Sequence, residues 1–340
     1  MLHKIAWSLP RLTNESSRRL LITTLTILLM AGASSSPAGA QQDYPNKPVK
    51  ILVGTPPGSS TDISARVLAD GLQQKLGGSF VVENRAGAAT NIATGAAARA
   101  EPDGYTLLWA SNSNTMNVSL LKNLPFDFAK DFAPIAMIVQ TPLFLVINPD
   151  IPAKSVSEFV ALAKANPGKY NFATTGSGSA NHLAVALFSL RSDIKLTTVY
   201  YKGSVAGVAD ILTGRVHAMF SPGSSALAHI ESGKLRALAV TSRKRSAVAA
   251  NIATMIEGGI PNFEVTFWNA LAAPTGTPPA IVEKLAKAAT DIASSNKFAE
   301  VMKKRGSDPL PMGSQEFGAY IKADIEKWAE VIKAAGIEPR

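Results

Sequence analysis

The 340-residue sequence contains no cysteine. This absence excludes disulfide bonds, thiolate metal ligands, a cysteine nucleophile and a lipidated N-terminal cysteine. The G-x-S-x-G, G-x-x-x-x-G-K-[ST] and G-x-G-x-x-G patterns are also missing, so the usual marks of a hydrolase nucleophile, a P-loop and a dinucleotide site are not found. Beyond the N-terminal region, His182, His217 and His229 are not spaced as a helical metal pair. We therefore predict no metal, no cofactor and no enzyme activity.

Long runs of charge are missing as well. The formal net charge is +9, of which the first 40 residues contribute +3, and the densest basic cluster is only Arg243–Arg245. Zinc-finger spacing and basic stripes with interleaved aromatics do not occur, so we expect no nucleic-acid partner. The modest positive excess of the remaining chain favours an anionic ligand at long range.

The first 40 residues have the pattern of a secretory signal peptide. Basic residues precede the uncharged run Leu20–Met30, which is too short to span a bilayer comfortably, and Ala38-Gly39-Ala40 is a small-residue cleavage site. We predict cleavage after Ala40 and a periplasmic mature protein. A transmembrane anchor is the alternative interpretation. Ser17-Arg18-Arg19 also resembles a twin-arginine signal, so Sec and twin-arginine export both stay open.

After residue 44, β-rich runs alternate with helical patterns. Val49–Val53 is a predicted strand, Ser60–Leu76 an amphipathic helix ended by two glycines, and Phe80–Val82 a second strand. A helix over about 88–99 and a strand over 106–110 complete this first series. A second series contains helices at 155–165, 180–190 and 205–212, and strands at 171–174, 197–201, 218–220 and 235–240. The alternation predicts two mostly parallel sheets covered by helices.

Two long apolar segments, about 136–147 and 263–273, are predicted to cross between these sheets. The first domain would then combine residues 44–143 with 266–340, and the second would contain residues 144–265. A helix from Pro278-Pro279 to about residue 294 and helices around 314–335 would end the chain. Trp268, on the second crossing segment, is interpreted as interdomain core rather than as a ligand contact.

Four polar loops follow predicted strands, where ligands bind in such folds. In Thr55–Asp62, a glycine allows close backbone approach, and serines begin a helix whose free N–H groups prefer an anion. The alternative is a capping box, with Ser59 as N-cap and Asp62 three residues later. In Thr174–His182, the alternatives are a second anion-binding loop or a turn capped by Ser179, with His182 structural.

The other two loops are also open to two interpretations. In Tyr201–Ser204, Lys202 could pair with a carboxylate or simply be solvated. In Ser111–Thr115, the side chains could supply neutral hydrogen bonds or merely cap a turn. Anion-binding loops without a nucleophile, base or metal favour capture of a ligand over catalysis.

These loops, with other blocks in the same order, resemble the Bug family, the substrate-binding proteins of tripartite tricarboxylate transporters. The resemblance runs from about Tyr44 to Ile337. The matching blocks are Tyr44–Val49, Pro56-Pro57-Gly58 with Asp62, Val82–Arg85, Pro102–Leu108, Ala163–Lys169, Gly176–Ser179 with His182, Tyr201–Gly203, Gly233–Thr241 and Ala273–Pro278.

The resemblance implies an α/β, two-domain periplasmic binding protein of type II (Venus-flytrap), with the two crossing strands as hinge. Such a protein closes on a small organic carboxylate, which backbone N–H groups of the proline–glycine loop hold. Together with the loop analysis, it gives the predicted ligand-binding residues Pro57, Gly58, Ser59, Ser60, Asp62, Ser111, Asn112, Thr175, Gly176, Ser177, His182, Tyr201, Lys202, Gly203 and Ser204.

Three departures from the family pattern lie near the expected cleft. Ser59 replaces a second glycine and adds a side-chain donor, Ala86 replaces a proline, and Ala206-Gly207 replaces a proline–alanine pair. They are consistent with an altered specificity, so the sequence predicts the class of acid but not its identity.

The implied partners are the small organic acid and either membrane transporter subunits or a sensor kinase, and we expect a monomer. Two other function classes stay open. One is an exported α/β hydrolase that uses a serine with His182, and the other is a structural or adhesive periplasmic protein that has lost ligand binding. A binding protein that serves sensing only is a further alternative.

Overall fold

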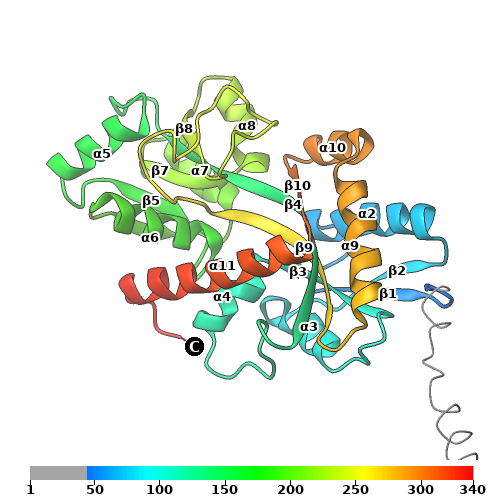
Figure 1. Cartoon of the computed structure of the whole chain (residues 1–340). Helices are drawn as coiled ribbons and strands as arrows, with labels where there is room; N and C mark the ends of the chain where they lie inside the picture. The colour runs from blue at the N-terminus through cyan, green and yellow to red at the C-terminus, as the bar shows by residue number, and fades with distance from the viewer. Residues whose placement is uncertain (1–43, 340) are drawn as a thin grey trace, which may run out of the picture. The chain divides into compact units, whose positions relative to one another are not determined.

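The computed structural model describes residues 44–339, whose course is traced in Figure 1. The predicted signal peptide and its cleavage site lie outside the described residues. Residues 45–339 belong to one compact unit, and within the described range no helix is both long and apolar enough to cross a membrane.

The strands of the described chain join into one ten-stranded sheet. Its main order is β2-β1-β3-β9-β4-β7-β5-β6, and β10 and β8 also pair with β4. The strands are β1 (Val49–Val53), β2 (Phe80–Asn84), β3 (Thr106–Ser111), β4 (Phe132–Ile147), β5 (Asn171–Thr174), β6 (Thr197–Tyr200), β7 (Ala218–Pro222), β8 (Arg236–Val240), β9 (Thr266–Pro274) and β10 (Asp308–Met312).

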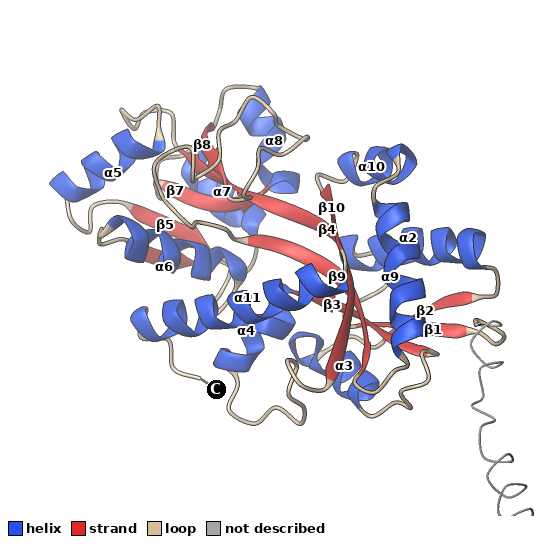
Figure 2. Cartoon of the chain, in the orientation of Figure 1, coloured by secondary structure: helices blue, strands red, loops and turns tan. Residues whose placement is uncertain are grey.

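Helices flank this sheet (Figure 2). Helices α2 and α9 pack against each other, and α11 packs against both α4 and α6. The helices are α2 (Ser60–Leu76), the 3-10 turn η1 (Ala88–Thr90), α3 (Asn91–Ala98), α4 (Asn112–Leu120), α5 (Val156–Ala165), α6 (Ala180–Ser192), α7 (Ser204–Leu212), α8 (Gly223–Glu231), α9 (Pro279–Ala293), α10 (Asn296–Lys303) and α11 (Ser314–Ala334).

Strand β4 divides the sheet into two lobes. Its first part pairs with β9 as far as Pro142, opposite Thr266, and its last part pairs with β7 from Leu143, opposite Pro222. We call the strands β2, β1, β3, β9 and β10 with the first part of β4 lobe 1, and β8, β7, β5 and β6 with its last part lobe 2. Pro142, which has no N–H to donate to a ladder, stands at this change of partner. The domain bounds at 143 and 265 stay predictions.

The directions of the strands bring the carboxyl edges of the two lobes face to face. Strands β3 and β4 both run antiparallel to β9, so β3 points from lobe 1 toward lobe 2; β7 runs antiparallel to β4 and points back. Ser111, at the end of β3, is level with Val139 of β4, whereas Pro222, at the end of β7, is level with Leu143. At ~3.3 Å per residue, the two ends are about 13 Å apart along β4.

Thr241 ties together the two chain segments that cross between the lobes. Its Oγ1 accepts a hydrogen bond from Leu143 N (2.8 Å) and donates to Val265 O (2.6 Å). Its backbone N–H also donates to Leu143 O (3.0 Å). The side chain is fully buried, so the crossings are joined by a hydrogen-bonded residue shielded from water.

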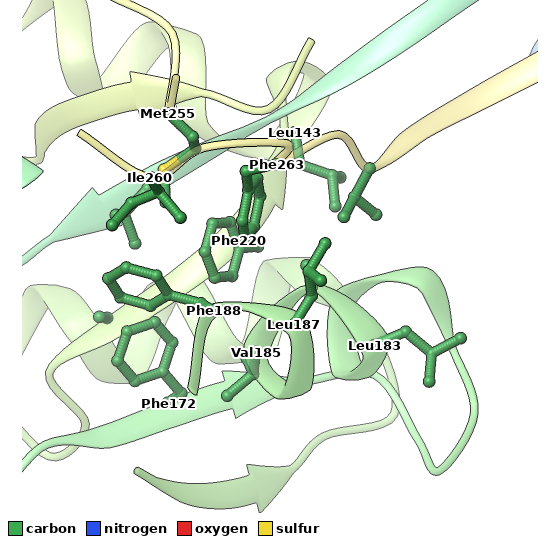
Figure 3. Packing of buried hydrophobic residues seen from close by; sticks show 14 of the residues in the cluster. Leu143, Phe172, Leu183, Val185, Leu187, Phe188, Phe220, Met255, Ile260 and Phe263 are labelled. Carbon is green, nitrogen blue, oxygen red and sulfur yellow. The ribbon is translucent and has the colours of Figure 1, made fainter. Parts of the chain in front are cut away.

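Aromatic side chains fill the core of lobe 2. Phe172, Phe188, Phe220 and Phe263 are completely buried, and Figure 3 shows them gathered between β5, β7 and α6. The Phe220 and Phe263 rings stack with centroids 5.6 Å apart. Burying each such ring contributes ~2–3 kcal/mol before entropy is counted. Trp328 of α11 belongs to the same cluster, so α11 completes this core.

The predicted alternation of strands and helices is confirmed, with two corrections to the crossing region. The sheet is continuous and mixed rather than two mostly parallel sheets, because β4 and β9 cross in opposite directions. The second crossing strand begins at Thr266 rather than at Phe263. Phe263 instead enters the core of lobe 2, and Val265 N donates to Thr241 O (3.1 Å). Trp268 is 1% exposed, which confirms its interpretation as a core residue, but it packs within the lobe 1 core rather than between the domains.

The sequence patterns missed three short helices and one strand: α4, α8, α10 and β10. The predicted polar loop at 111–115 is the start of α4. The C-terminal helices expected around 314–335 are the single helix α11. Helix α4 has weak hydrophobic periodicity. Helices α8 and α10 are amphipathic, but they have only nine and eight residues, which is shorter than the window over which periodicity is judged.

Candidate functional site

A cavity of about 240 Å³ lies between the facing edges of the two lobes. Its floor is formed by the crossing strands, through Val139, Thr141, Phe267 and Asn269. Ser60, Thr61 and Ser64 of α2 line one wall. Pro222, Gly223 and Ser224, at the start of α8, line the opposite wall, and Met302, Arg305, Gly306 and Ser307 close one side.

The loop before α2 is held by the carboxylate of Asp62. Its Oδ2 accepts from Gly58 N (2.8 Å) and Arg66 Nε (3.0 Å), and its Oδ1 accepts from Asn84 Nδ2 (2.8 Å). Partial desolvation raises the pKa of Asp62, but the hydrogen bonds from Arg66, Gly58 and Asn84 outweigh it and lower the pKa below its usual range. Gly58 has φ +80°, a conformation that glycine adopts without strain.

These contacts decide which groups of the first loop are available to a ligand. Asp62 is 1% exposed, so its carboxylate positions the loop, and the Gly58 N–H is already used. The predicted cap is confirmed, because Ser59 Oγ accepts from Asp62 N (3.2 Å). The N–H groups of Ser60 and Thr61 have no partner in the described chain and stand at the positive end of a 17-residue helix. Pro57, Gly58 and Ser60 are exposed.

The start of α8 offers a second set of free backbone donors. Pro222 is its N-cap and forms no side-chain capping bond. The N–H groups of Gly223 and Ser224 therefore lack partners within the described residues. A Cβ on Gly223 would lie 3.1 Å from Phe144 and Leu227, so glycine allows this turn to pack closely. Two helix N-termini from opposite lobes thus line one cavity and favour an anion.

The loop before α6 repeats the geometry of the loop before α2. Ser179 is the N-cap and accepts from His182 N (3.2 Å), and Gly178 N donates to His182 Nδ1 (3.1 Å). Burial lowers the pKa of His182, which favours the neutral ring. Because Nδ1 accepts the Gly178 N–H, the ring proton belongs on Nε2, which lies 3.3 Å from Tyr200 Oη. Both ring nitrogens are engaged inside lobe 2. A ligand role for His182 stays a prediction.

The remaining predicted residues of lobe 2 lie at the same carboxyl edge. Thr175 Oγ1 donates to Asn181 Oδ1 (3.0 Å), and Tyr201 Oη donates to Asp210 Oδ2 (2.8 Å). Desolvation and Asp210 raise the pKa of Tyr201. Three further positions are accessible to different degrees: Gly176 and Gly203 are half-buried and Ser177 is exposed.

Lys202 and Ser204 stand where β6 leads into α7. Lys202 is exposed and has no ion-pair partner among residues 44–339, and Ser204 is the first residue of α7, whose N-cap Gly203 provides no side-chain cap. This junction is therefore a third helix start at the carboxyl edge of lobe 2.

Ser111 and Asn112 are buried at the start of α4. Ser111 N donates to Asn114 Oδ1 (2.8 Å), and Asn112 Nδ2 lies 3.6 Å from Met116 Sδ. The capping interpretation thus accounts for these contacts, while Ser111 also pairs with Asn269 on the cavity floor.

Sequence reasoning missed the start of α8 and Arg305. A signal was present for α8, because Pro222-Gly223-Ser224-Ser225 repeats the letters of Pro57-Gly58-Ser59-Ser60 after another predicted strand. Arg305 had no local signal, since only the fold brings it to the cavity. Among residues 44–339, no group of three or more His, Asp or Glu residues is arranged to hold a metal ion.

The chain resembles known proteins over nearly its whole length. It is 37% identical over 318 residues to protein BugT of Bordetella pertussis, which covers 93% of this chain and 97% of that protein. The solved structure of R. palustris Rpa4515 with adipate is 31% identical, with a TM-score of 0.69, and covers 88% of this chain and 100% of that one.

A second solved structure supports the same assignment. The periplasmic binding protein BugD is 35% identical, with a TM-score of 0.65 and coverage of 87% and 100%. These likenesses confirm the α/β fold of a two-domain binding protein. Residues 64–337 match the family described as tripartite tricarboxylate transporter family receptor, and the chain belongs to that family.

Proposed function

We propose that this protein is a periplasmic receptor that captures a small organic carboxylate in the cavity between its lobes. The observation that carries the proposal is the meeting of two helix N-termini, those of α2 and α8, across one cavity. Each presents backbone N–H groups without a partner in the described chain, and such groups bind carboxylates. The family match and the adipate-bound relative support the same ligand class.

Closure of the lobes would bring both helix starts onto one ligand. The acid first docks on one lobe, and the other lobe adds contacts that exist only in the closed state. The ligand then shifts the open–closed equilibrium by its difference in affinity for the two states. Motion would centre on the crossings near Pro142 and Val265, where β4 changes its pairing partner.

The geometry favours this function over hydrolysis. The alternative needs a serine hydroxyl hydrogen-bonded to His182, but the ring nitrogens of His182 face Gly178 N and Tyr200 Oη. The relatives are receptors that bind or transport solutes. We therefore propose capture without turnover.

The ligand-bound form would be handed to membrane transporter subunits, and a sensor kinase is a second candidate reader. The mature protein would act in the periplasm as a monomer after cleavage behind Ala40. The family match supports the transporter partner, whereas cleavage behind Ala40 is proposed from the sequence pattern alone.

The test uses residues 41–340, purified and titrated with small mono-, di- and tricarboxylates in a thermal-shift and calorimetric screen. We expect selective stabilisation of about 2.7 kcal/mol at a hundredfold excess over Kd. Small-angle scattering should show compaction with the same acid, and the matched uncharged amide should have no effect. Absence of binding and of compaction with every acid would refute the proposal.

A further inference from the structure

Arg305 is the one charged residue among those that line the cavity in the described chain. It is exposed, and it forms no ion pair or side-chain hydrogen bond with residues 44–339. Two arginines elsewhere in the protein have carboxylate partners: Arg66 pairs with Asp62, and Arg243 pairs with Glu264. A guanidinium at a cavity wall without an anion of its own can receive one from a ligand.

The backbone around Arg305 is fixed although its side chain is free. Arg305 N donates to Met302 O (2.9 Å), and Gly306, at φ +72°, donates to Lys303 O (3.0 Å). Ser307 Oγ shares a hydrogen bond of 2.6 Å with Thr141 Oγ1 on the cavity floor. The turn is therefore attached to β4, and it holds the base of the arginine side chain beside the cavity.

The two walls of the cavity and the side that carries Arg305 present different groups to a ligand. The starts of α2 and α8 present neutral N–H groups with a partial positive charge, which suit one carboxylate. Arg305 adds a full charge and a planar pair of donors, which suit a second carboxylate. A ligand with a single carboxylate would leave one of the two sets unused.

We propose that Arg305 is the residue that selects a dianionic ligand, by binding its second carboxylate while the helix starts bind the first. This inference rests on the proposed function and narrows its ligand to dicarboxylates with both acids ionised. The carbon chain of the ligand would have to be long enough to reach from the helix starts to the guanidinium.

The experiment compares diacids with monoacids of equal length by calorimetry: succinate, adipate and suberate against butyrate, hexanoate and octanoate. The variants are Arg305→Gln, Arg305→Lys and, as a matched surface control, Lys304→Gln. Lys304 is exposed on the preceding residue and does not line the cavity. Measuring at two salt concentrations separates direct contact from long-range attraction.

We expect the wild type to bind a diacid more tightly than the monoacid of equal length. Arg305→Gln should weaken the affinity for that diacid at least tenfold and leave the affinity for the monoacid unchanged. Arg305→Lys should recover part of the loss, because charge is kept but the bidentate fork is not. Lys304→Gln should change the affinity for either acid by no more than about twofold.

If Arg305→Gln lost affinity equally for both acids, or lost none, the proposed role of Arg305 would be overturned and the receptor function would stay intact. A wild type that binds monoacids at least as tightly as diacids would do the same. A wild type that binds no carboxylate at all would instead refute the proposed function, and with it this inference.

Discussion

The helix starts of α2 and α6 share one backbone design but differ in the charge of one residue. In each, a glycine with positive φ precedes a serine N-cap, and the third residue after the serine accepts the glycine N–H. That acceptor is the carboxylate of Asp62 in lobe 1 and the neutral imidazole of His182 in lobe 2. The same geometry therefore depends on an ionised group in one lobe and on an un-ionised group in the other.

The start of α8 shows what happens when the acceptor is missing. It repeats the Pro-Gly-Ser-Ser letters of the first loop, but Leu227 stands where Asp62 follows the first copy. Helix α8 begins at the glycine rather than after the serine, and it has no side-chain cap. The acceptor three residues after the serine, rather than the tetrapeptide, decides where the helix begins and how many donors stay free.

We expect the largest effect from Asp62→Asn, which removes the charge of the carboxylate that accepts the Gly58 N–H. Loss of the charge-assisted hydrogen bonds to Arg66, Gly58 and Asn84 should lower the free energy of unfolding by about 2–3 kcal/mol. Urea unfolding at neutral pH measures this, with the exposed Asp70 as the matched Asp→Asn control. Because the folded pKa of Asp62 is lowered, the stabilisation is present above its unfolded pKa and is lost as pH falls through the folded value. A difference that persists in strong acid would contradict the charge as its cause.

Ser224→Asp tests whether the uncapped start of α8 serves the ligand. A carboxylate at the first turn should stabilise the helix slightly but repel the ligand. We expect binding to weaken by about 30-fold, or ~2 kcal/mol, without loss of folding. Ser232→Asp, at the other end of α8, is the control and should leave binding unchanged. Equal affinity of Ser224→Asp and the wild type would exclude α8 from the site.

Gly58→Ala tests the contribution of the positive φ at Gly58 to stability. No atom lies within 4 Å of a Cβ added at this glycine, so the cost comes from the positive φ alone. We expect a loss of about 1 kcal/mol in the free energy of unfolding. An unchanged midpoint in urea would mean that the loop relaxes to another conformation at no cost.

The smallest expected effect is on the pH dependence of stability, through the neutral ring of His182 that accepts the Gly178 N–H. Burial lowers its folded pKa, so its contribution is present above the unfolded pKa and is lost as pH falls through the folded value. Protonation removes the acceptor for Gly178 N, at a cost of about 1 kcal/mol. His182→Gln keeps an acceptor and should flatten the decline between about pH 7 and 5 relative to the wild type. As a control, His229→Gln, at a half-buried position in the last turn of α8, should keep the decline of the wild type.

The sequence allowed the local parts of this comparison to be predicted and left the long-range parts hidden. Ser59 and Ser179 were identifiable as N-caps because each serine and the backbone N–H that it accepts from, at Asp62 and His182, are only three residues apart. The start of α8 has a proline as cap, which carries no polar side chain to signal it. Arg305 and Asn269 reach the cavity only through the pairing of β4, β9 and β10, and no local pattern reports such pairing.

Thr241 has a consequence for the kinetics of the molecule. One buried side chain hydrogen-bonds both crossing segments, at Leu143 and at Val265. We expect these bonds to couple the twisting of the two segments, so that the lobes move in a single rotational mode. We expect relaxation-dispersion measurements to report one exchange process common to residues of both lobes. Thr241→Val should split it into two processes with different time constants.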